Sequence, residues 1–346
     1  MSSERVVLIV TNAVNGGGAE KSSVTIFNCL VERKVNAYLC AINVPTINHS
    51  DSNAERIFSL NRKWKSGLYS TISAWFRFYE IYRSLRPQTI IVNCELPELF
   101  ASLLIDRRTR FIFVEHTSKP WINRRSIGFF VRLINYFKKS LWVSVVDDTK
   151  GIWPTGKRAI YIANPVPFSQ TRNSRDGINR ENEAMMKNLV YVGRLNKDKN
   201  VESVVKASLD LNLHLDVYGE GSLLGYLKEL ASKKDKLIEF HGFVANPWNQ
   251  ISFNHLVIVP SKFEGDGLVC LEAALNGNHL LLADNEDLRR LSFQNRHYYV
   301  DYEDMLKKVV EWKNGKLSLQ LNSFERKKII EDRDPDQVIR KWQQII

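Results

Sequence analysis

The sequence predicts an α/β protein whose two successive halves each build a parallel sheet covered by helices. Short apolar runs alternate with helix-length segments along the chain, which is the pattern of layered α/β folds. The polar stretch 168–187 interrupts this alternation near the middle and is typical of a linker. A length of 346 residues fits two domains of ordinary size. We therefore expect two Rossmann-like domains that face a central cleft, with ligands at the carboxyl ends of the strands.

The first half, residues 1–167, opens with a strand. The apolar run 6–10 is too short for the core of a signal peptide, and the segment 22–33 after it has apolar residues at helical spacing. Further strands are predicted at residues 37–42, 89–93, 110–115, 142–146 and 159–162. The longest candidate membrane span, 126–146, contains three basic residues, so we expect no membrane-spanning helix.

The second half, residues 188–335, repeats the alternation. Strands are predicted at residues 188–192, 214–218, 238–241, 255–259 and 280–283, and helices at 201–209, 222–233 and 271–276. The terminal segment 336–346 has apolar residues at helical spacing.

Positive charge is concentrated in the first half. Residues 1–165 contain 23 Lys and Arg against 12 Asp and Glu, whereas the remaining 181 residues contain 26 of each. Basic and aromatic residues are interleaved in two runs, one from Arg62 to Arg86 and one from Trp121 to Lys139. Helices of this composition are typical of a membrane interface, so we expect this half to bind an anionic membrane surface. An even distribution of charge for solubility is the alternative.

Three strand-to-helix junctions could bind a phosphorylated ligand. After the first strand, Gly16, Gly17 and Gly18 let backbone N–H groups approach a bulky group at a helix N-terminus, although the motif is neither GxGxxG nor a P-loop. After strand 188–192, Gly193 precedes Arg194, and Lys199 follows five residues later, so that two cations could neutralise a diphosphate.

The third junction, 260–274, is the most specific signal in the chain. Glycines at 265 and 267 free the backbone N–H groups of Leu268 and Val269 to bind a phosphate at a helix N-terminus. Glu264 and Glu272 are eight residues apart, and a carboxylate accepts two hydrogen bonds in a geometry that suits vicinal hydroxyls of a sugar or ribose.

Together these motifs resemble family 4 glycosyltransferases, which are retaining enzymes of the GT-B fold that use nucleotide sugars. The resemblance extends in order and spacing over nearly the whole chain and includes Asn164-Pro165-Val166 and His116, which matches the family's active-site histidine. It implies that 1–167 binds the acceptor, that 188–335 binds the donor, and that helix 336–346 crosses back to the first domain.

The resemblance also implies roles for single residues. Arg194 and Lys199 would bind the donor diphosphate, Glu272 the ribose and Glu264 the transferred sugar. The sugar and phosphates would be lined by Gly17, Gly18, Gly193, Gly267, Leu268 and Val269. His116 would contact the sugar near the reacting carbon. The base would lie beside Phe243 and Val244. Asp266, His279 and the segment 283–287 depart from the family pattern, which leaves the identity of the donor open.

We expect no cofactor and no metal ion, because two cations and helix N-termini already stabilise charge on the leaving diphosphate. The four cysteines show no zinc spacing and fit a reducing compartment. The predicted activity is transfer of a hexose or N-acetylhexosamine from a UDP-sugar to a lipid-linked or polysaccharide acceptor during cell-surface glycan synthesis. The enzyme would lie in the cytoplasm, peripheral on the inner face of the cell membrane.

Other functions stay open at this stage. A GDP-mannose-dependent mannosyltransferase of the same fold is one alternative, and an inverting enzyme that uses His116 or Glu115 as a base is another. A dinucleotide-dependent oxidoreductase would need GxGxxG and an acid after the second strand, and the chain has neither. No nucleic-acid-binding motif supports a non-catalytic nucleotide- or nucleic-acid-binding protein, so we expect no nucleic-acid partner.

Overall fold

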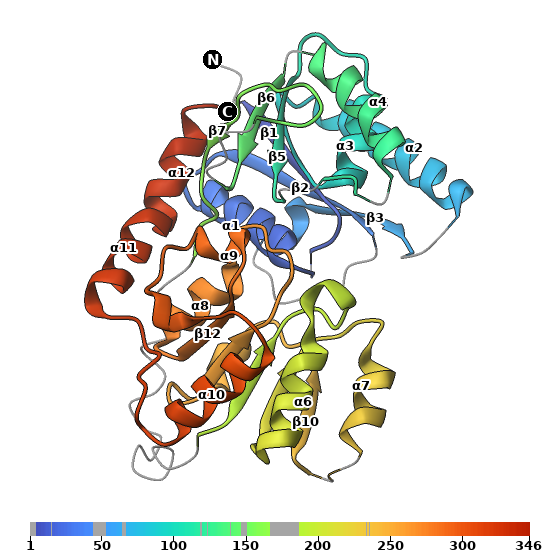
Figure 1. Cartoon of the computed structure of the whole chain (residues 1–346). Coiled ribbons are helices and arrows are strands. Elements are labelled where there is room, and N and C mark those ends of the chain that lie inside the picture. The colour runs from blue at the N-terminus through green and yellow to red at the C-terminus, as the bar shows by residue number, and fades with distance from the viewer. Residues whose placement is uncertain are drawn as a thin grey trace. The chain divides into compact units, whose positions relative to one another are not determined.

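The computed structural model describes residues 5–14, 16–43, 53–63, 67–117, 120–122, 124–138, 140–146, 151–166, 187–232, 234 and 236–346. The chain divides into two compact units, one made of Met1–Pro165 with Arg333–Ile346 and the other of Val166–Asp332. Each unit is a parallel sheet with helices on both faces (Figure 1), which confirms the α/β class. Of the expected linker 168–187, all but Lys187 lies outside the described residues.

The sheet of the first unit has the strand order β3-β2-β1-β4-β5-β6-β7. Its strands are β1 (Val6–Thr11), β2 (Asn36–Asn43), β3 (Ile57–Arg62), β4 (Thr89–Asn93), β5 (Arg110–Glu115), β6 (Ser140–Ser144) and β7 (Ile160–Tyr161). All neighbouring strands pair in parallel. The loops that follow β1, β4 and β5 therefore leave the same edge of the sheet from adjacent strands.

Two differences from the sequence-based prediction concern this sheet. The prediction lacked β3, an edge strand of which only Leu60 is fully buried, so its apolar pattern is weak. The strand predicted at 142–146 lies at Ser140–Ser144, because Ser140 and Leu141 pair with Phe111 and Ile112 of β5.

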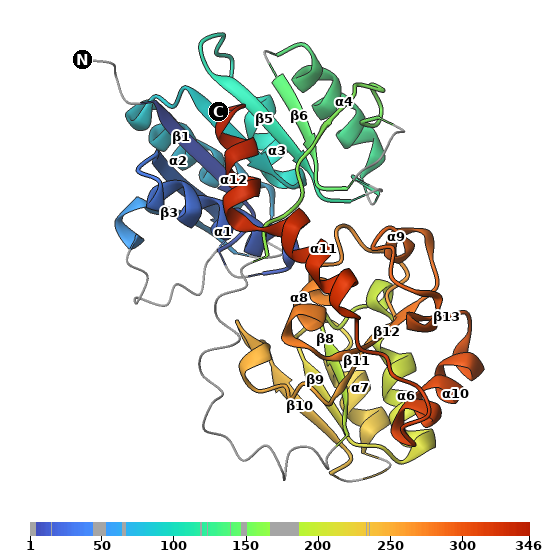
Figure 2. The same cartoon turned by 90° about the vertical axis from the view of Figure 1, so that its left-hand side faces the viewer.

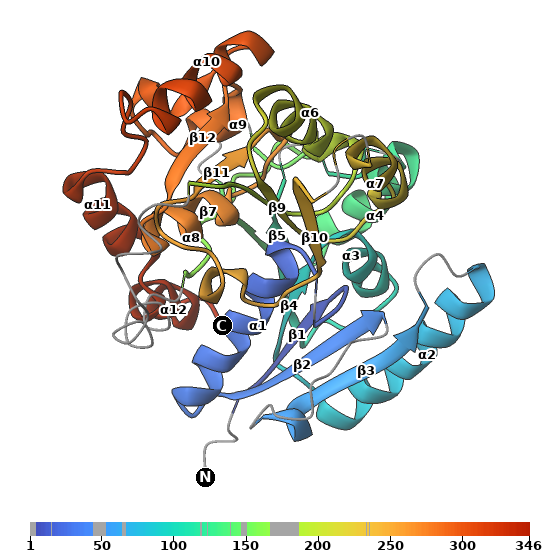
Figure 3. The same cartoon turned by 90° about the horizontal axis from the view of Figure 1, so that it is seen from below.

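The helices of the first unit are α1 (Gly18–Glu32), α2 (Leu68–Leu85), α3 (Glu95–Ser102), α4 (Arg125–Tyr136) and α12 (Pro335–Gln343). Phe27 of α1 and Trp342 of α12 are buried in one core cluster on one face of the sheet, and Figure 2 shows these two helices side by side. Phe78 of α2 and Phe100 of α3 are buried in the cluster on the other face, where α2 runs along β3 (Figure 3) and α4 packs on α3. The C-terminal helix thus belongs to the first unit.

The sheet of the second unit has the order β10-β9-β8-β11-β12-β13. Its strands are β8 (Leu189–Val192), β9 (Leu215–Tyr218), β10 (Ile238–Gly242), β11 (Leu256–Val259), β12 (His279–Ala283) and β13 (Tyr298–Tyr299). The helices are α6 (Val201–Leu211), α7 (Leu224–Ala231), α8 (Leu268–Asn276), α9 (Glu286–Arg289), α10 (Tyr302–Lys313) and α11 (Ser323–Arg333), with short 3-10 turns η2 (Lys197–Lys199) and η3 (Pro247–Asn249). α6 and α10 pack on one face and α8 on the other. Within the part of the chain that the structure describes, no helix is long and apolar enough to cross a membrane.

Candidate functional site

The loop after β8 is shaped by backbone and side-chain hydrogen bonds. Gly193 has φ 153°, and its N–H donates to the carbonyl of Tyr218 at 2.9 Å. A Cβ at this position would lie 3.0 Å from the Tyr191 hydroxyl, so a larger residue would be strained here. The Asn196 side chain accepts from the Lys199 backbone N–H at 3.1 Å and caps η2. These contacts fix the position from which the Lys199 side chain extends.

Lys199 and Glu264 come together although 65 residues separate them. The Lys199 ammonium forms an ion pair with the Glu264 carboxylate, and both side chains are largely buried, with exposed fractions of 19% and 16%. Arg194 is exposed, and within the described residues its guanidinium makes no hydrogen bond or ion pair. Burial raises the pKa of Tyr191, Glu264 raises it further and Arg194 opposes this, so both charges lie close to the same ring. The site therefore has one cation held by a carboxylate and one cation available to a ligand.

The loop after β11 ends at the N-terminus of α8. Gly267 has φ 66°, in the left-handed region, and a Cβ there would lie 3.1 Å from Leu291. Within the described part of the chain, the backbone N–H groups of Leu268 and Val269 have no hydrogen-bond acceptor. Upstream, the Glu264 N–H donates to Asp287 Oδ2 at 3.1 Å. This arrangement leaves two N–H donors and the positive end of the helix dipole available to an anion.

Glu272 is held by a buried tryptophan. Trp248 of η3 donates its indole N–H to Glu272 Oε2 at 2.6 Å. Val244, just before η3, packs against the same core cluster as Trp248, whereas Phe243 is exposed. Trp248 thus holds Glu272, the predicted ribose ligand, and belongs to the cluster against which Val244 packs.

The first unit contains the remaining predicted residues, which follow adjacent strands. Gly17 and Gly18 begin α1 after β1, and His116 follows β5. His116 Nε2 donates to Asn93 Oδ1, at the end of β4, at 2.8 Å. Burial lowers the pKa of His116 to about 4, so the ring is neutral at pH 7 and its Nδ1 is an acceptor. This neutral imidazole can accept a hydrogen bond from a sugar hydroxyl.

A buried charge cluster holds α4 against the end of β5. Arg132 of α4 contacts Glu115 Oε2 at 2.7 Å and Glu98 Oε1 at 3.2 Å. Trp121 donates its indole N–H to Glu98 Oε2 at 2.9 Å. Two carboxylates share one guanidinium, and burial raises the pKa of Glu98 to about 7.

Arg132 and Lys138, two basic residues that the sequence analysis placed on the membrane-binding surface, point inward. Arg132 is 3% exposed, and the Lys138 ammonium donates to the carbonyls of Ala101, Ser102 and Leu104. A helix C-terminus leaves carbonyls that need donors, and Lys138 provides them at the end of α3. Burial lowers the pKa of Lys138 to about 8. Lys139 and the segment 64–66 lie outside the described residues.

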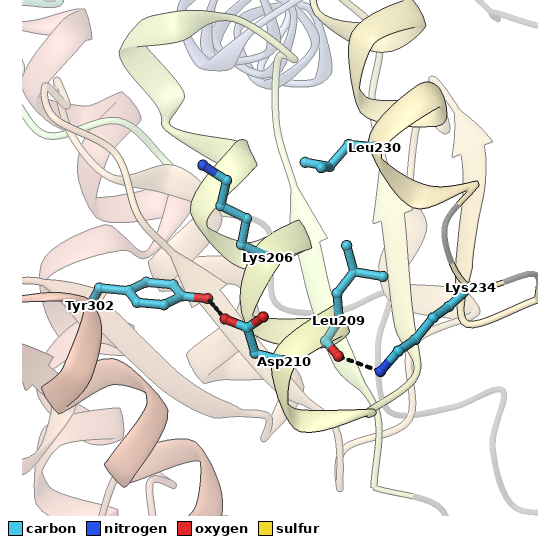
Figure 4. Close-up of a pocket in the computed structure, with 6 residues that line it drawn as sticks. All are labelled: Lys206, Leu209, Asp210, Leu230, Lys234 and Tyr302. Carbon is cyan, nitrogen blue, oxygen red and sulfur yellow. Dashed lines mark hydrogen bonds between the residues drawn. The ribbon is translucent and has the colours of Figure 1, made fainter.

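A separate pocket of about 510 Å³ lies against α6 and α7 (Figure 4). Polar atoms around it already have partners: the Tyr302 hydroxyl donates to Asp210 at 2.7 Å, and Lys234 donates to the Leu209 carbonyl at 2.6 Å. None of the residues predicted to bind the donor lines it.

Sequence reasoning missed Asn93, Trp248 and Asp287. Asn93 ends a predicted strand next to the one that precedes His116, so the rule that ligands gather at adjacent strand ends could have identified it. Trp248 and Asp287 act through contacts made across 24 and 23 residues, for which the sequence has no local signal.

Comparison with known proteins gives concordant matches. Residues 175–291 match the family model described as glycosyl transferases group 1. A Campylobacter jejuni protein, "GalNAc-alpha-(1->4)-GalNAc-alpha-(1->3)-diNAcBac-PP-undecaprenol alpha-1,4-N-acetyl-D-galactosaminyltransferase", is 24% identical over 312 residues, which are 81% of this chain and 83% of that protein. The structure of Anabaena HepE in complex with UDP and glucose has a TM-score of 0.76 at 14% identity, covering 98% of both chains. A Staphylococcus aureus TarM variant in complex with Fondaparinux, alpha-GlcNAc-glycerol and UDP has a TM-score of 0.71 at 12% identity, covering 98% of this chain and 99% of that one.

Fold and family match together define the class of this protein as a glycosyltransferase of the GT-B fold. The match to glycosyl transferases group 1 includes Arg194, Lys199, Glu264 and Glu272 of the second unit. The resemblance to glycosyltransferases is therefore confirmed, and membership of family 4 stays a prediction.

Proposed function

We propose that the protein is a retaining glycosyltransferase that moves a hexose or N-acetylhexosamine from a UDP-sugar to a lipid-linked or polysaccharide acceptor in cell-surface glycan synthesis. The observation that carries this proposal is the ion pair of Lys199 with Glu264, four residues before the N-terminus of α8. The exposed Arg194 lies close to the same tyrosine ring, and its guanidinium has no partner among the described residues. Support for a UDP donor comes from the HepE and TarM structures, both of which contain UDP. Support for a lipid-linked acceptor comes from the undecaprenol-linked substrate in the name of the Campylobacter relative.

The proposed reaction breaks the bond between the anomeric carbon and the diphosphate oxygen, whose electron pair leaves with the nucleoside diphosphate. Arg194, Lys199 and the free N–H groups of Leu268 and Val269 stabilise the charge that develops on this leaving group. The acceptor oxygen forms the new bond on the same face, and its proton passes to the departing phosphate. No protein nucleophile is needed, and the chain's own cations supply the neutralisation that a metal ion would otherwise provide.

The remaining residues position the substrate in this proposal. Glu272, oriented by Trp248, binds the ribose hydroxyls, and the exposed Phe243 ring with Val244 lies against the base. Glu264 binds hydroxyls of the transferred sugar and is paired with Lys199. Neutral His116 accepts a hydrogen bond from a hydroxyl of the same sugar near the reacting carbon. The backbone N–H groups of Gly17 and Gly18 line the phosphates.

A donor panel tests the proposal. The purified chain is incubated with UDP-glucose, UDP-galactose, their N-acetylhexosamine analogues and GDP-mannose, each with a polyprenyl-diphosphate-linked glycan. Nucleotide release and sugar transfer are measured separately, and the product anomer is assigned by NMR. Transfer from a UDP-sugar with retention supports the proposal. Transfer from GDP-mannose alone supports the mannosyltransferase alternative, an inverted anomer contradicts retention, and binding without turnover supports a non-catalytic protein.

We further propose that α2 and α4 bind the anionic inner face of the cell membrane. Both helices expose large apolar side chains: Leu68, Tyr69, Ile72, Phe76 and Tyr79 on α2, and Ile127, Phe129, Phe130, Leu133 and Ile134 on α4, followed by Phe137. Arg124 and Arg125 are exposed at the start of α4. Peripheral membrane helices typically insert aromatic rings into the lipid interface, while neighbouring basic side chains contact the lipid headgroups.

Co-sedimentation with vesicles of phosphatidylglycerol and phosphatidylethanolamine tests this surface. Replacing Phe130 and Phe137 by Ser, or Arg124 and Arg125 by Glu, should remove most of the binding. Phe324→Ser is the matched control, because Phe324 is 76% exposed on α11 of the other unit, similar to Phe137 at 78%. Unchanged binding of the α4 variants contradicts the proposal.

A further inference from the structure

Two histidines and two carboxylates gather at β9 and β10, with His214 directly before β9, outside the proposed donor contacts. β10 is the edge strand of its sheet, and Glu239 pairs directly with Asp216 of β9. His214 precedes Asp216 by two residues and so lies on the same face of the sheet. The register shifts at His241, between Phe240 and Gly242, and a shift of this kind re-aims a side chain.

Three potential ligand atoms of this cluster lie close together. One ligand atom each of His214, Asp216 and Glu239 lie within 4.8 Å of one another, and His214 Nε2 is 3.4 Å from Asp216 Oδ1. Ligand bonds of about 2.0–2.2 Å in a tetrahedral zinc site place neighbouring donor atoms roughly 3.4 Å apart. The separation of His214 and Asp216 matches this spacing, and a ligand atom of Glu239 lies within 4.8 Å of both.

His241 contacts the Asp216 carboxylate and lies near that of Glu239. Its Nε2 is 2.9 Å from Asp216 Oδ1, and its Nδ1 is 3.8 Å from Glu239 Oε1. The ring is stacked on Tyr218 with 4.4 Å between ring centres, which fixes its orientation. A hydrogen bond to a ligating carboxylate orients that carboxylate and tunes its basicity.

We propose that His214, Asp216 and Glu239 bind a divalent transition metal of the zinc class, with His241 positioning Asp216. Two carboxylates balance the charge of the ion, and an imidazole ligand favours zinc or cobalt over magnesium. The side chain of Glu239 is 63% exposed and that of His214 33% exposed, so an ion can enter from solvent. Asp216 is 14% exposed and forms the inner wall of the site.

A bound ion would join the edge strand to its neighbour. β10 leads through Gly242 to Phe243, and the Gly219 N–H donates to the Gly242 carbonyl at 2.7 Å. A ligand that binds only the folded state raises stability by mass action, so occupancy would stabilise β10 and the loop that follows it. None of the residues of this site is assigned to the donor, so zinc binding can be measured without reference to sugar transfer.

Calorimetric titration of the untagged, chelator-treated full chain with zinc chloride tests the proposal. We expect one zinc ion per chain, no heat with magnesium chloride, and a rise in melting temperature with zinc. Cobalt chloride should produce visible absorption bands of a four- or five-coordinate ion. A chain that binds neither zinc nor cobalt at 100 µM overturns the proposal.

Two surface substitutions locate the ion. Glu239→Gln and His214→Gln should each weaken zinc binding at least tenfold and remove the thermal shift. Glu331→Gln is the matched control, since Glu331 is 60% exposed on α11, nearly the same as Glu239. Zinc affinity equal to wild type in either ligand variant overturns the assignment, whatever the outcome of the sugar-transfer assays.

Discussion

At the scale of single residues, Lys199 distinguishes a ligand-binding cation from a surface charge. Its ion pair with Glu264 and its low exposure separate it from Lys197, which is exposed two residues earlier on the same turn. We predict that Lys199→Ala lowers kcat about 10²–10³-fold, the range measured for loss of one preorganised donor to a developing anion. Nucleotide release in a steady-state assay checks this.

The matched variant Lys197→Ala should keep wild-type kcat, because this side chain is exposed and, within the described residues, forms no ion pair with Glu264. Glu272→Gln should also lower turnover by orders of magnitude while its melting temperature changes little, since the amide still accepts from Trp248. A large fall in melting temperature for Lys199→Ala or Glu272→Gln would mean that the residue stabilises the fold and is not specifically a substrate-binding residue.

Glu98 should make stability depend on pH. Burial raises its pKa from 4.5 to about 7, so between these values the folded chain binds more protons than the unfolded chain. The contribution of Glu98 to the free energy of unfolding should therefore fall as pH rises through this window, by at most about 1.4 kcal/mol per unit. Urea titrations at pH 5 and pH 8 measure it. Glu98→Gln should lose less stability than wild type over this range, and Glu80→Gln, at an exposed site on α2, should behave as wild type.

At the scale of elements, α4 is held by a close approach of its backbone to Trp121. A Cβ at Gly128 would lie 2.3 Å from the Trp121 ring, and both residues are buried. We predict that Gly128→Ala lowers the free energy of unfolding by about 1–3 kcal/mol, the usual effect of overpacking. Urea denaturation checks this prediction.

Gly225→Ala on α7 is the control, because no atom lies within 4 Å of the added methyl group. It should raise stability by about 0.5–1 kcal/mol through helix propensity alone. A Gly128→Ala variant as stable as wild type would mean that α4 can move away from Trp121 without loss.

Elements with strong apolar patterns could be predicted from the sequence. The predicted strands 89–93 and 110–115 coincide with β4 and β5, in which every residue but Arg110 and Glu115 is buried. β13 was missed because a strand of two residues is too short to show an apolar pattern. The inward turn of Lys138 could not be predicted, because it depends on where α3 ends in space.

Part of the candidate site could also be predicted from the sequence, and part could not. The glycines, Glu264 and Lys199 follow strand ends that the sequence indicates, so their loops could be located in advance. The pairing of Lys199 with Glu264 and the support of Glu272 by Trp248 are tertiary contacts, which local pattern does not encode.

At the scale of the whole molecule, the first unit is closed by the far end of the chain. Val338, Ile339 and Trp342 of α12 are at most 1% exposed and are buried in the same cluster as Phe27 and Leu30 of α1. Residues 1–165 alone would leave this apolar face of α1 uncovered. The first unit therefore depends on residues that are distant in sequence from the rest of it.

Trp342→Ala should accordingly weaken the first unit and spare the second. Loss of a buried tryptophan typically lowers the free energy of unfolding by about 3–5 kcal/mol. Hydrogen exchange followed by mass spectrometry should show faster exchange in β1 and α1 and unchanged exchange in β8 and β11. Lys341→Ala, at the exposed neighbouring position, should leave all four elements unchanged. Equal acceleration in both units would instead mean that they unfold as one body, so that α12 stabilises the whole chain and not the first unit alone.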